Sequence, residues 1–253
     1  FSADIRLLIN HVNCCGIRVV DEGTNGFFQN CDVSELLTSI EKTRRFKHLL
    51  TSLGLLQIVN RDSVMPDTNS IDKVFTHHPN TFLFYPEEKI ILMPINLIFP
   101  EADENLKIES KSSKKVFLID PFCHEKRIDE ETYKLALDDV LKIIKSKYDT
   151  QKLEISFHPT IRHDDGYMSR IISVIERHNI KPVLLNVDLE QHFLNNDGVL
   201  FCTYSSSMIW ANVMGWQVVT WIVFLPKEFF EKIEKVQCIG RYFKACNTKR
   251  LEF

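Results

Sequence analysis

The sequence predicts an α/β protein with two Rossmann-like domains, each built on a parallel sheet. The composition is that of a folded, soluble chain, because 44% of its 253 residues are apolar and 26% are charged. In the second half, short apolar runs alternate with amphipathic stretches, which is the pattern of successive βα units. A polar segment, EADENLKIESKSSKK, occupies 101–115 and predicts a linker. We therefore expect domains at 1–100 and 116–240, followed by a tail at 241–253.

The first domain is expected to open with a helix over 3–14, where apolar residues recur at helical spacing, and a short strand over 17–20. Another helix is predicted over 32–50. Residues 71–99 hold short strand-like runs (KVF, TFLFY, KIILM) that are broken by prolines. Because the chain begins without Met so close to its first strand, we expect that opening elements of this domain precede Phe1.

The second domain is expected to alternate strand and helix throughout. Strands are predicted over 116–120, 152–157, 182–187, 198–203 and 217–224. Helices are predicted over 129–148, 167–178, 206–214 and 227–235. In a parallel sheet of this kind ligands bind at the carboxyl ends of the strands. The residues that follow each strand are therefore the candidates for a functional site.

Charge and glycine content narrow the function. The 31 Lys and Arg residues nearly balance the 34 Asp and Glu residues, which excludes the basic excess of proteins that bind nucleic acid by neutralising phosphates. Only 8 residues are glycine, about 3% against a usual ~7%, and none forms the Gly-rich GxGxxG or Walker-type phosphate loop. The 7 cysteines show no CxxC pair, which predicts free thiols in a reducing compartment. Any bound nucleotide must be held by another device.

Three serines supply a candidate for that device. Ser205, Ser206 and Ser207 lie between a predicted strand and a predicted helix. Hydroxyls and unpaired backbone N–H groups at a helix start favour an anion such as a phosphate. Ordinary capping of the helix by serine is the alternative.

A histidine follows the predicted strand 152–157. His158 is held by Pro159, and an imidazole at this edge could donate a proton or a hydrogen bond to a leaving phosphate. A purely structural histidine is the alternative. We set aside the second pair, His78-Pro79, because it lies among the proline-broken runs of the first domain.

Acidic residues follow two other predicted strands. Glu190 could accept hydrogen bonds from a ribose diol, or be an exposed residue at a helix start. In the first domain Asp21 and Glu22 form a turn after strand 17–20, and either could deprotonate a hydroxyl nucleophile. No DxD motif or His/Asp cluster predicts a metal site.

Taken in chain order, these motifs resemble those of the bacterial sialyltransferases of the GT-B fold, which include the lipooligosaccharide sialyltransferases and the capsular polysialyltransferases. The stretch VFLIDPFCHEKRIDEETY is also similar to the opening of the donor domain in the lipooligosaccharide group. One departure is that Ser156-Phe157 stand where a basic residue commonly precedes His-Pro. The resemblance implies a GT-B architecture, with two Rossmann-like domains facing a central cleft and a C-terminal segment that crosses back to the first.

The resemblance also implies an activity. It is the transfer of sialic acid from CMP-sialic acid to a sugar hydroxyl of a surface glycan, lipooligosaccharide or capsular polysaccharide, with inversion and without a metal or other cofactor. A monophosphate leaving group needs less charge neutralisation than a diphosphate. The implied roles are general base for Asp21 or Glu22, assistance to CMP departure for His158, ribose binding for Glu190, and phosphate binding for Ser205 and Ser206.

The same motifs also fit other functions. A CMP-Kdo transferase or a GT-B-shaped sugar-nucleotide epimerase would use similar groups, and a non-catalytic two-lobed protein could bind a glycan or nucleotide in the same place. The expected partners are a CMP-sugar and a glycan acceptor, with no nucleic acid. We expect a cytoplasmic protein whose basic tail either rests on the anionic inner face of the membrane or crosses back to the first domain.

Overall fold

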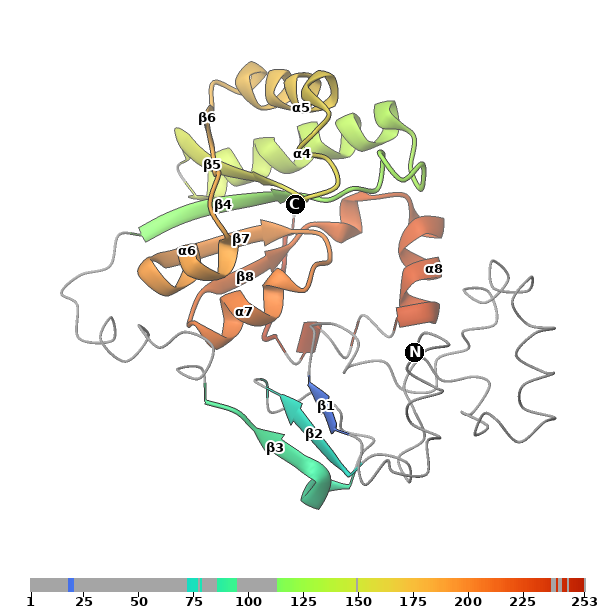
Figure 1. The fold of residues 1–253 in the computed structure, drawn as a ribbon. Helices are drawn as coiled ribbons and strands as arrows, with labels where there is room; N and C mark the ends of the chain where they lie inside the picture. The colour runs from blue at the N-terminus through green and yellow to red at the C-terminus, as the bar shows by residue number, and fades with distance from the viewer. Residues whose placement is uncertain are drawn as a thin grey trace. The chain divides into compact units, whose positions relative to one another are not determined.

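The computed structural model describes residues 18–20, 72–76, 78, 86–94, 113–148, 150–237, 240, 243–244 and 246–252. The chain divides into two compact units, Phe1–Pro94 with Ile233–Cys238, and Ile95–Lys232 with Ile239–Phe253. Each unit contains a parallel sheet, and α-helices follow the strands of the second unit. The predicted α/β class is therefore confirmed (Figure 1).

The first unit holds a three-stranded parallel sheet in the order β1-β2-β3. Its strands are β1 (Arg18–Val20), β2 (Lys73–Thr76) and β3 (Ile90–Leu92), and a 3-10 turn, η4 (Glu87–Lys89), precedes β3. The strands predicted at 17–20 and in the KVF and KIILM runs are thus confirmed. The helices predicted over 3–14 and 32–50 and the TFLFY run lie outside the described residues.

The second unit holds a six-stranded parallel sheet in the order β6-β5-β4-β7-β8-β9. The strands are β4 (Ser113–Ile119), β5 (Lys152–Phe157), β6 (Lys181–Leu184), β7 (Asp197–Cys202), β8 (Gln217–Thr220) and β9 (Lys249–Arg250). In chain order this is third, second, first, fourth, fifth and sixth, which is the Rossmann strand order. The order reverses between β4 and β7, so this is the topological switch point where such sheets bind ligands.

The helices of this unit pair on the two faces of the sheet. They are α4 (Glu130–Tyr148), α5 (Asp165–Arg177), α6 (Leu189–Asn195), α7 (Ser207–Val213) and α8 (Lys227–Gln237), with a 3-10 turn η6 (Ile222–Phe224). Helix α4 packs beside α5, and α6 beside α7 (Figure 1). Right-handed crossovers to either side of β4 place the two pairs on opposite faces. None of the helices in the described ranges is long and apolar enough to cross a membrane.

Aromatic side chains fill the core between the sheet and α4. The ring of Phe117 on β4 stacks on Phe201 of β7 and on Trp221, with centroids 6.4 and 5.6 Å apart, and Tyr133 of α4 meets Trp221 edge-on at 5.6 Å. All four are buried. Offset and edge-to-face contacts of this kind add to the free energy gained from burial, so this cluster holds the two central strands against α4.

Some element boundaries differ from the predictions. β4 starts at Ser113, inside the expected linker, because Ser113 and Lys114 already pair with Asp197 and Gly198 of β7. The strand predicted over 182–187 ends at Leu184, and the one predicted over 217–224 ends at Thr220. Beyond Thr220 the chain turns into η6, where the Phe224 N–H donates to the Trp221 carbonyl at 3.0 Å.

Two elements were not predicted. Helix α6 has seven residues, begins shortly after the run predicted as a strand over 182–187, and buries Leu189, Phe193 and Leu194. Strand β9 falls in the expected tail 241–253 and pairs with β8 in two residues. The segment of the C-terminal part that belongs with the first unit is Ile233–Cys238.

One of the few glycines is required by strand pairing. Gly198 on β7 faces Lys114 on β4, and a Cβ on Gly198 would lie 2.0 Å from the Lys114 carbonyl oxygen. Any side chain here would push the two central strands apart.

Candidate functional site

The carboxyl edge of the six-stranded sheet brings the predicted second-domain residues together. His158 follows β5, and its backbone N–H donates to the Ile119 carbonyl at the end of β4, at 3.0 Å. Ser205 to Ser207 follow β7, the neighbour of β4 on its other side. His158 and the serines therefore flank the same strand end, at the switch point.

His158 contacts Thr160 through Nδ1. The Thr160 backbone N–H donates to Nδ1 at 3.4 Å, and the Thr160 hydroxyl oxygen lies 2.9 Å from the same nitrogen. The bond from the N–H favours the tautomer whose proton is on Nε2. Burial, the larger cause, and the charge of Arg162 lower the pKa of His158, against an opposing effect of Glu125. At neutral pH the ring thus offers one N–H donor.

The loop around this histidine is ordered by backbone and side-chain bonds. Pro159 is exposed and continues the chain into a turn, in which the Ile161 N–H donates to the His158 carbonyl at 2.9 Å. The Arg162 Nε donates to the Phe157 carbonyl at 3.0 Å. A guanidinium therefore lies near His158, although no basic residue precedes the His-Pro pair in sequence.

The serines form the start of α7. The Ser205 Oγ accepts a hydrogen bond from the N–H of Ser207, the first residue of α7, at 3.3 Å, whereas the side chain of Ser206, which directly precedes the helix, makes no capping bond. Ser206 is exposed, Ser205 half-buried and Ser207 buried. Helix α7 begins at Ser207, one residue later than predicted.

The start of α7 also differs in charge from the other helix starts at this edge. Its first turn has no acidic residue. By contrast, α4 starts with Glu130 and Glu131, α5 has Asp165 in its first turn, and α6 has Glu190. An anion bound at any of those three helix starts would lie near a carboxylate of the same sign, and the repulsion would disfavour binding.

Glu190 lies in the first turn of α6, after the edge strand β6, and is half-buried. β6 neighbours β5, so Glu190 and His158 follow adjacent strands. Asp21 and Glu22 lie outside the described residues, although β1 ends at Val20, directly before them.

His78, from the His-Pro pair that we set aside in the first domain, follows a strand. His78 comes two residues after β2, the central strand of the three-stranded sheet, and it is buried. Its backbone N–H donates to the Thr76 hydroxyl at 3.2 Å. The strand before His78 was predicted, but the prolines in 71–99 led us to set the His-Pro pair aside, because proline normally counts against a regular strand.

Sequence reasoning missed Asp120, a buried carboxyl group directly after β4. Its Oδ2 accepts a hydrogen bond from the Thr203 N–H at 3.3 Å and a short one from the Thr203 hydroxyl. Burial, the dominant cause, raises the pKa of Asp120 to about 7, and the bonds from Thr203 oppose the rise. The available signal was a single acid at the end of an apolar run, VFLID, which is where a parallel sheet presents its site residues.

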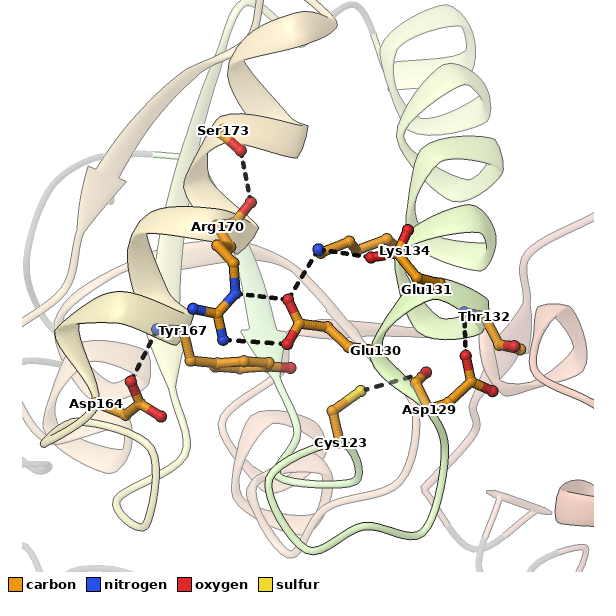
Figure 2. A network of polar contacts seen from close by, with 10 residues as sticks. All are labelled: Cys123, Asp129, Glu130, Glu131, Thr132, Lys134, Asp164, Tyr167, Arg170 and Ser173. Atoms are coloured by element: carbon orange, nitrogen blue, oxygen red, sulfur yellow. Dashed lines mark hydrogen bonds and ion pairs between the residues drawn. The ribbon is translucent and has the colours of Figure 1, made fainter.

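A polar network joins helices α4 and α5 (Figure 2). The Glu130 carboxylate of α4 accepts hydrogen bonds from Nε and Nη2 of Arg170 on α5, at 2.6 and 3.1 Å. It also forms an ion pair with Nζ of Lys134 at 2.8 Å. Arg170 first, then Lys134, lowers the pKa of Glu130 to about 2. The start of α4 is closed by the Asp129 Oδ1, which accepts from the Thr132 N–H at 2.8 Å. The network ties the first turn of α4 to the second turn of α5.

The cysteines within the described ranges, Cys123, Cys202 and Cys246, are free thiols, as predicted. Burial raises the pKa of Cys123 to about 11, so it is not a nucleophile at neutral pH. In the same ranges, no three His, Cys, Asp or Glu side chains are grouped so that they could hold a metal ion.

Comparison with known proteins gives distant structural neighbours. No protein-family profile and no curated protein sequence matches the chain. A variant of the wall teichoic acid polymerase TagF aligns at a TM-score of 0.32 and 16% identity over 65% of this chain and 45% of the polymerase. A glycosyltransferase from Rickettsia africae ESF-5 aligns at 0.31 and 12%, over 71% of this chain and 60% of that protein. The chain thus spans about half the length of these two neighbours.

Proposed function

We propose that the protein is a glycosyltransferase that takes a sugar from a nucleotide donor bound at the switch point of the second unit. The observation that carries the proposal is the pair of groups on either side of β4. One is the His158 imidazole, and the other is the serine turn before α7, whose first turn has no acidic residue. Together they supply hydrogen-bond donors to one phosphate.

The finer proposal is that the donor is CMP-sialic acid. A monophosphate ester carries one phosphorus group, which fits a short serine turn better than a diphosphate would. The carboxylates at the start of α4 occupy the place where Rossmann sheets usually bind a diphosphate, which favours a phosphate farther along, after β7. Charge, position and the motif resemblance together favour CMP-sialic acid as the donor.

In the proposed reaction, the acceptor hydroxyl loses its proton to Asp21 or Glu22 and its oxygen attacks the anomeric carbon. The bond between that carbon and the phosphate oxygen breaks, the configuration inverts, and CMP leaves with the bonding electron pair. Nε2–H of His158 donates to the departing phosphate, the Ser205 and Ser206 groups bind it, and Glu190 binds the ribose. No metal ion takes part in this scheme.

Ligand binding tests the donor class first. The intact protein is screened by thermal shift with CMP, UDP, GDP and CMP-Neu5Ac, and the expected result is stabilisation by CMP and CMP-Neu5Ac alone. Stabilisation by UDP alone would support an epimerase, and stronger stabilisation by CMP-Kdo than by CMP-Neu5Ac would support a Kdo transferase. CMP binding without CMP release in the presence of a galactoside would support a non-catalytic binding protein.

Substitution then tests the mechanism. His158→Ala is expected to lower turnover by about 100-fold or more, the range for a lost acid catalyst. His163→Ala is the matched control, because His163 is exposed in the same loop. Near-normal transfer by His158→Ala would refute the role. Ser205→Ala with Ser206→Ala is expected to weaken CMP binding in calorimetry, with Ser173→Ala on α5 as the control; unchanged affinity would leave the serines as a helix cap only.

The place of action belongs to the same proposal. We infer a cytoplasmic enzyme that works near the inner face of the membrane, with a surface glycan precursor as acceptor. Fractionation of cells that express the full-length protein tests this, and recovery only in the external medium would refute it.

A further inference from the structure

At the switch point, the Asp120 side chain joins the ends of β4 and β7 beyond the last backbone pair of their ladder. The β4 to β7 ladder runs from Ser113 opposite Asp197 to Phe117 opposite Phe201. Asp120 and Thr203 lie beyond it, and their side chains join the two strand ends across 83 residues of sequence. A buried carboxyl group is costly to desolvate, so an apolar pair would be the cheaper way to fill this place.

Thr203 is held from its other side as well. The Thr220 hydroxyl at the end of β8 donates to the Thr203 carbonyl at 2.6 Å, and the Trp221 N–H donates to the Cys202 carbonyl at 3.1 Å. Thr203 and Thr220 are fully buried. The backbone at Thr203 is therefore fixed by bonds from β4 on one edge and from β8 on the other.

This fixed point lies two residues before Ser205. The turn from Thr203 to Ser207 is short, so the position of its first residue determines where the Ser205 and Ser206 groups lie. On the opposite side, β4 also receives the His158 N–H, at the Ile119 carbonyl. The end of β4 therefore bonds to both segments that the proposed function assigns to the phosphate, the one that starts at His158 and the one that leads to Ser205.

We propose that Asp120 is a positioning residue, which holds the Thr203 to Ser207 turn against β4 at the distance from His158 that one phosphate requires. Asp120 does not touch the substrate, because its side chain is buried. The proposal rests on the proposed function for the identity of the ligand. A phosphate clamp built on two strands needs its halves set to within about 0.5 Å, and a buried hydrogen-bonded pair is a rigid way to set them.

Thr203→Val tests this with little change of shape. It removes the hydroxyl donor to Asp120, and we expect hydrogen exchange of amides 203–208 to become about 10-fold faster and CMP to bind about 10-fold more weakly. Thr203→Ser keeps the donor, and we expect it to stay within about 3-fold of the wild type in both measurements. Thr150→Val is the matched control, since Thr150 is also buried and its hydroxyl donates to the Tyr148 carbonyl, before β5 and away from β4 and β7.

Thr220→Val is the second variant. It removes the hydroxyl that donates to the Thr203 carbonyl from the β8 side. We expect the same rise in hydrogen exchange of amides 203–208 and a smaller loss of CMP affinity. With two variants, the test still gives a result if one of them fails to fold. Exchange of 203–208 that is unchanged in both valine variants would overturn the positioning role, even if the wild type binds CMP. A wild type that binds no CMP would overturn the proposed function and the phosphate role with it, whatever the exchange shows.

Discussion

The buried carboxyl group of Asp120 predicts an unusual dependence of stability on pH. In the folded protein its pKa is about 7, mainly because burial penalises the charged form, against 3.8 in an exposed setting. Between these pH values the unfolded chain has released the proton and the folded protein still holds it. Raising the pH therefore favours unfolding, and the stability that this group contributes is full below about pH 4 and lost by about pH 7.

The size of the effect follows from the two pKa values. At about 1.4 kcal/mol per pKa unit, a rise from 3.8 to about 7 corresponds to about 4 kcal/mol. Asp120→Asn cannot titrate but retains an oxygen that can accept from Thr203. The free energy of unfolding of the wild type, minus that of Asp120→Asn, is therefore expected to fall by about 4 kcal/mol from pH 4 to pH 8.

Urea unfolding at several pH values, followed by tryptophan fluorescence, measures this difference. All 3 tryptophans, Trp210, Trp216 and Trp221, lie in the second unit, so the signal reports the unit that contains Asp120. Other carboxyl groups titrate alike in both proteins and cancel in the difference. Glu154→Gln, a buried carboxyl removed from the middle of β5, is the control. Parallel stability curves for wild type and Asp120→Asn would refute the reasoning.

Three further predictions concern the second unit. Gly198→Ala is expected to destabilise it by more than about 3 kcal/mol in urea unfolding, because the new Cβ would meet backbone at 2.0 Å, whereas Gly166→Ala, with its nearest atoms at 3.5 Å, is expected to be tolerated; equal effects would contradict the strand contact. Arg162→Gln is expected to raise the pKa of His158, read from the imidazole C2 proton in an NMR titration, and an unchanged or lower pKa would contradict the contact. Trp216→Phe is expected to cost about 1–3 kcal/mol, because the indole N–H donates to two carbonyls in and after α6; a change below about 0.5 kcal/mol would show that these bonds contribute little.

The alternation of strands and helices in the second unit could be predicted because each element has its own local pattern. The apolar runs at 116–120 and 152–157 and the helical period at 129–148 depend on residues that are near one another in sequence. Exceptions occurred where local signal was short or misleading. Helix α6 follows a run that was predicted as strand as far as Val187, and the prolines in 71–99 led us to set aside His78, although the strand before it was predicted.

Part of the candidate site was predictable for a related reason. His158 and Ser205 were found because each follows a predicted strand, and a parallel sheet places all such residues at one edge. Asp120 meets the same rule, yet its importance depends on Thr203, which is 83 residues away. No local pattern encodes that pairing.

By itself, the sequence determined which segments become strands and helices and which residues end up after the strands, because the period of apolar side chains selects the backbone conformation. Only the tertiary structure decided that β4 lies between β5 and β7, so that His158, Asp120 and the serine turn follow three neighbouring strands. The physical reason is that strand order comes from how the helices cover the two faces of the sheet, which is a property of the packed chain. The same packing buries Asp120 and gives it a pKa of about 7, which composition and spacing could not reveal.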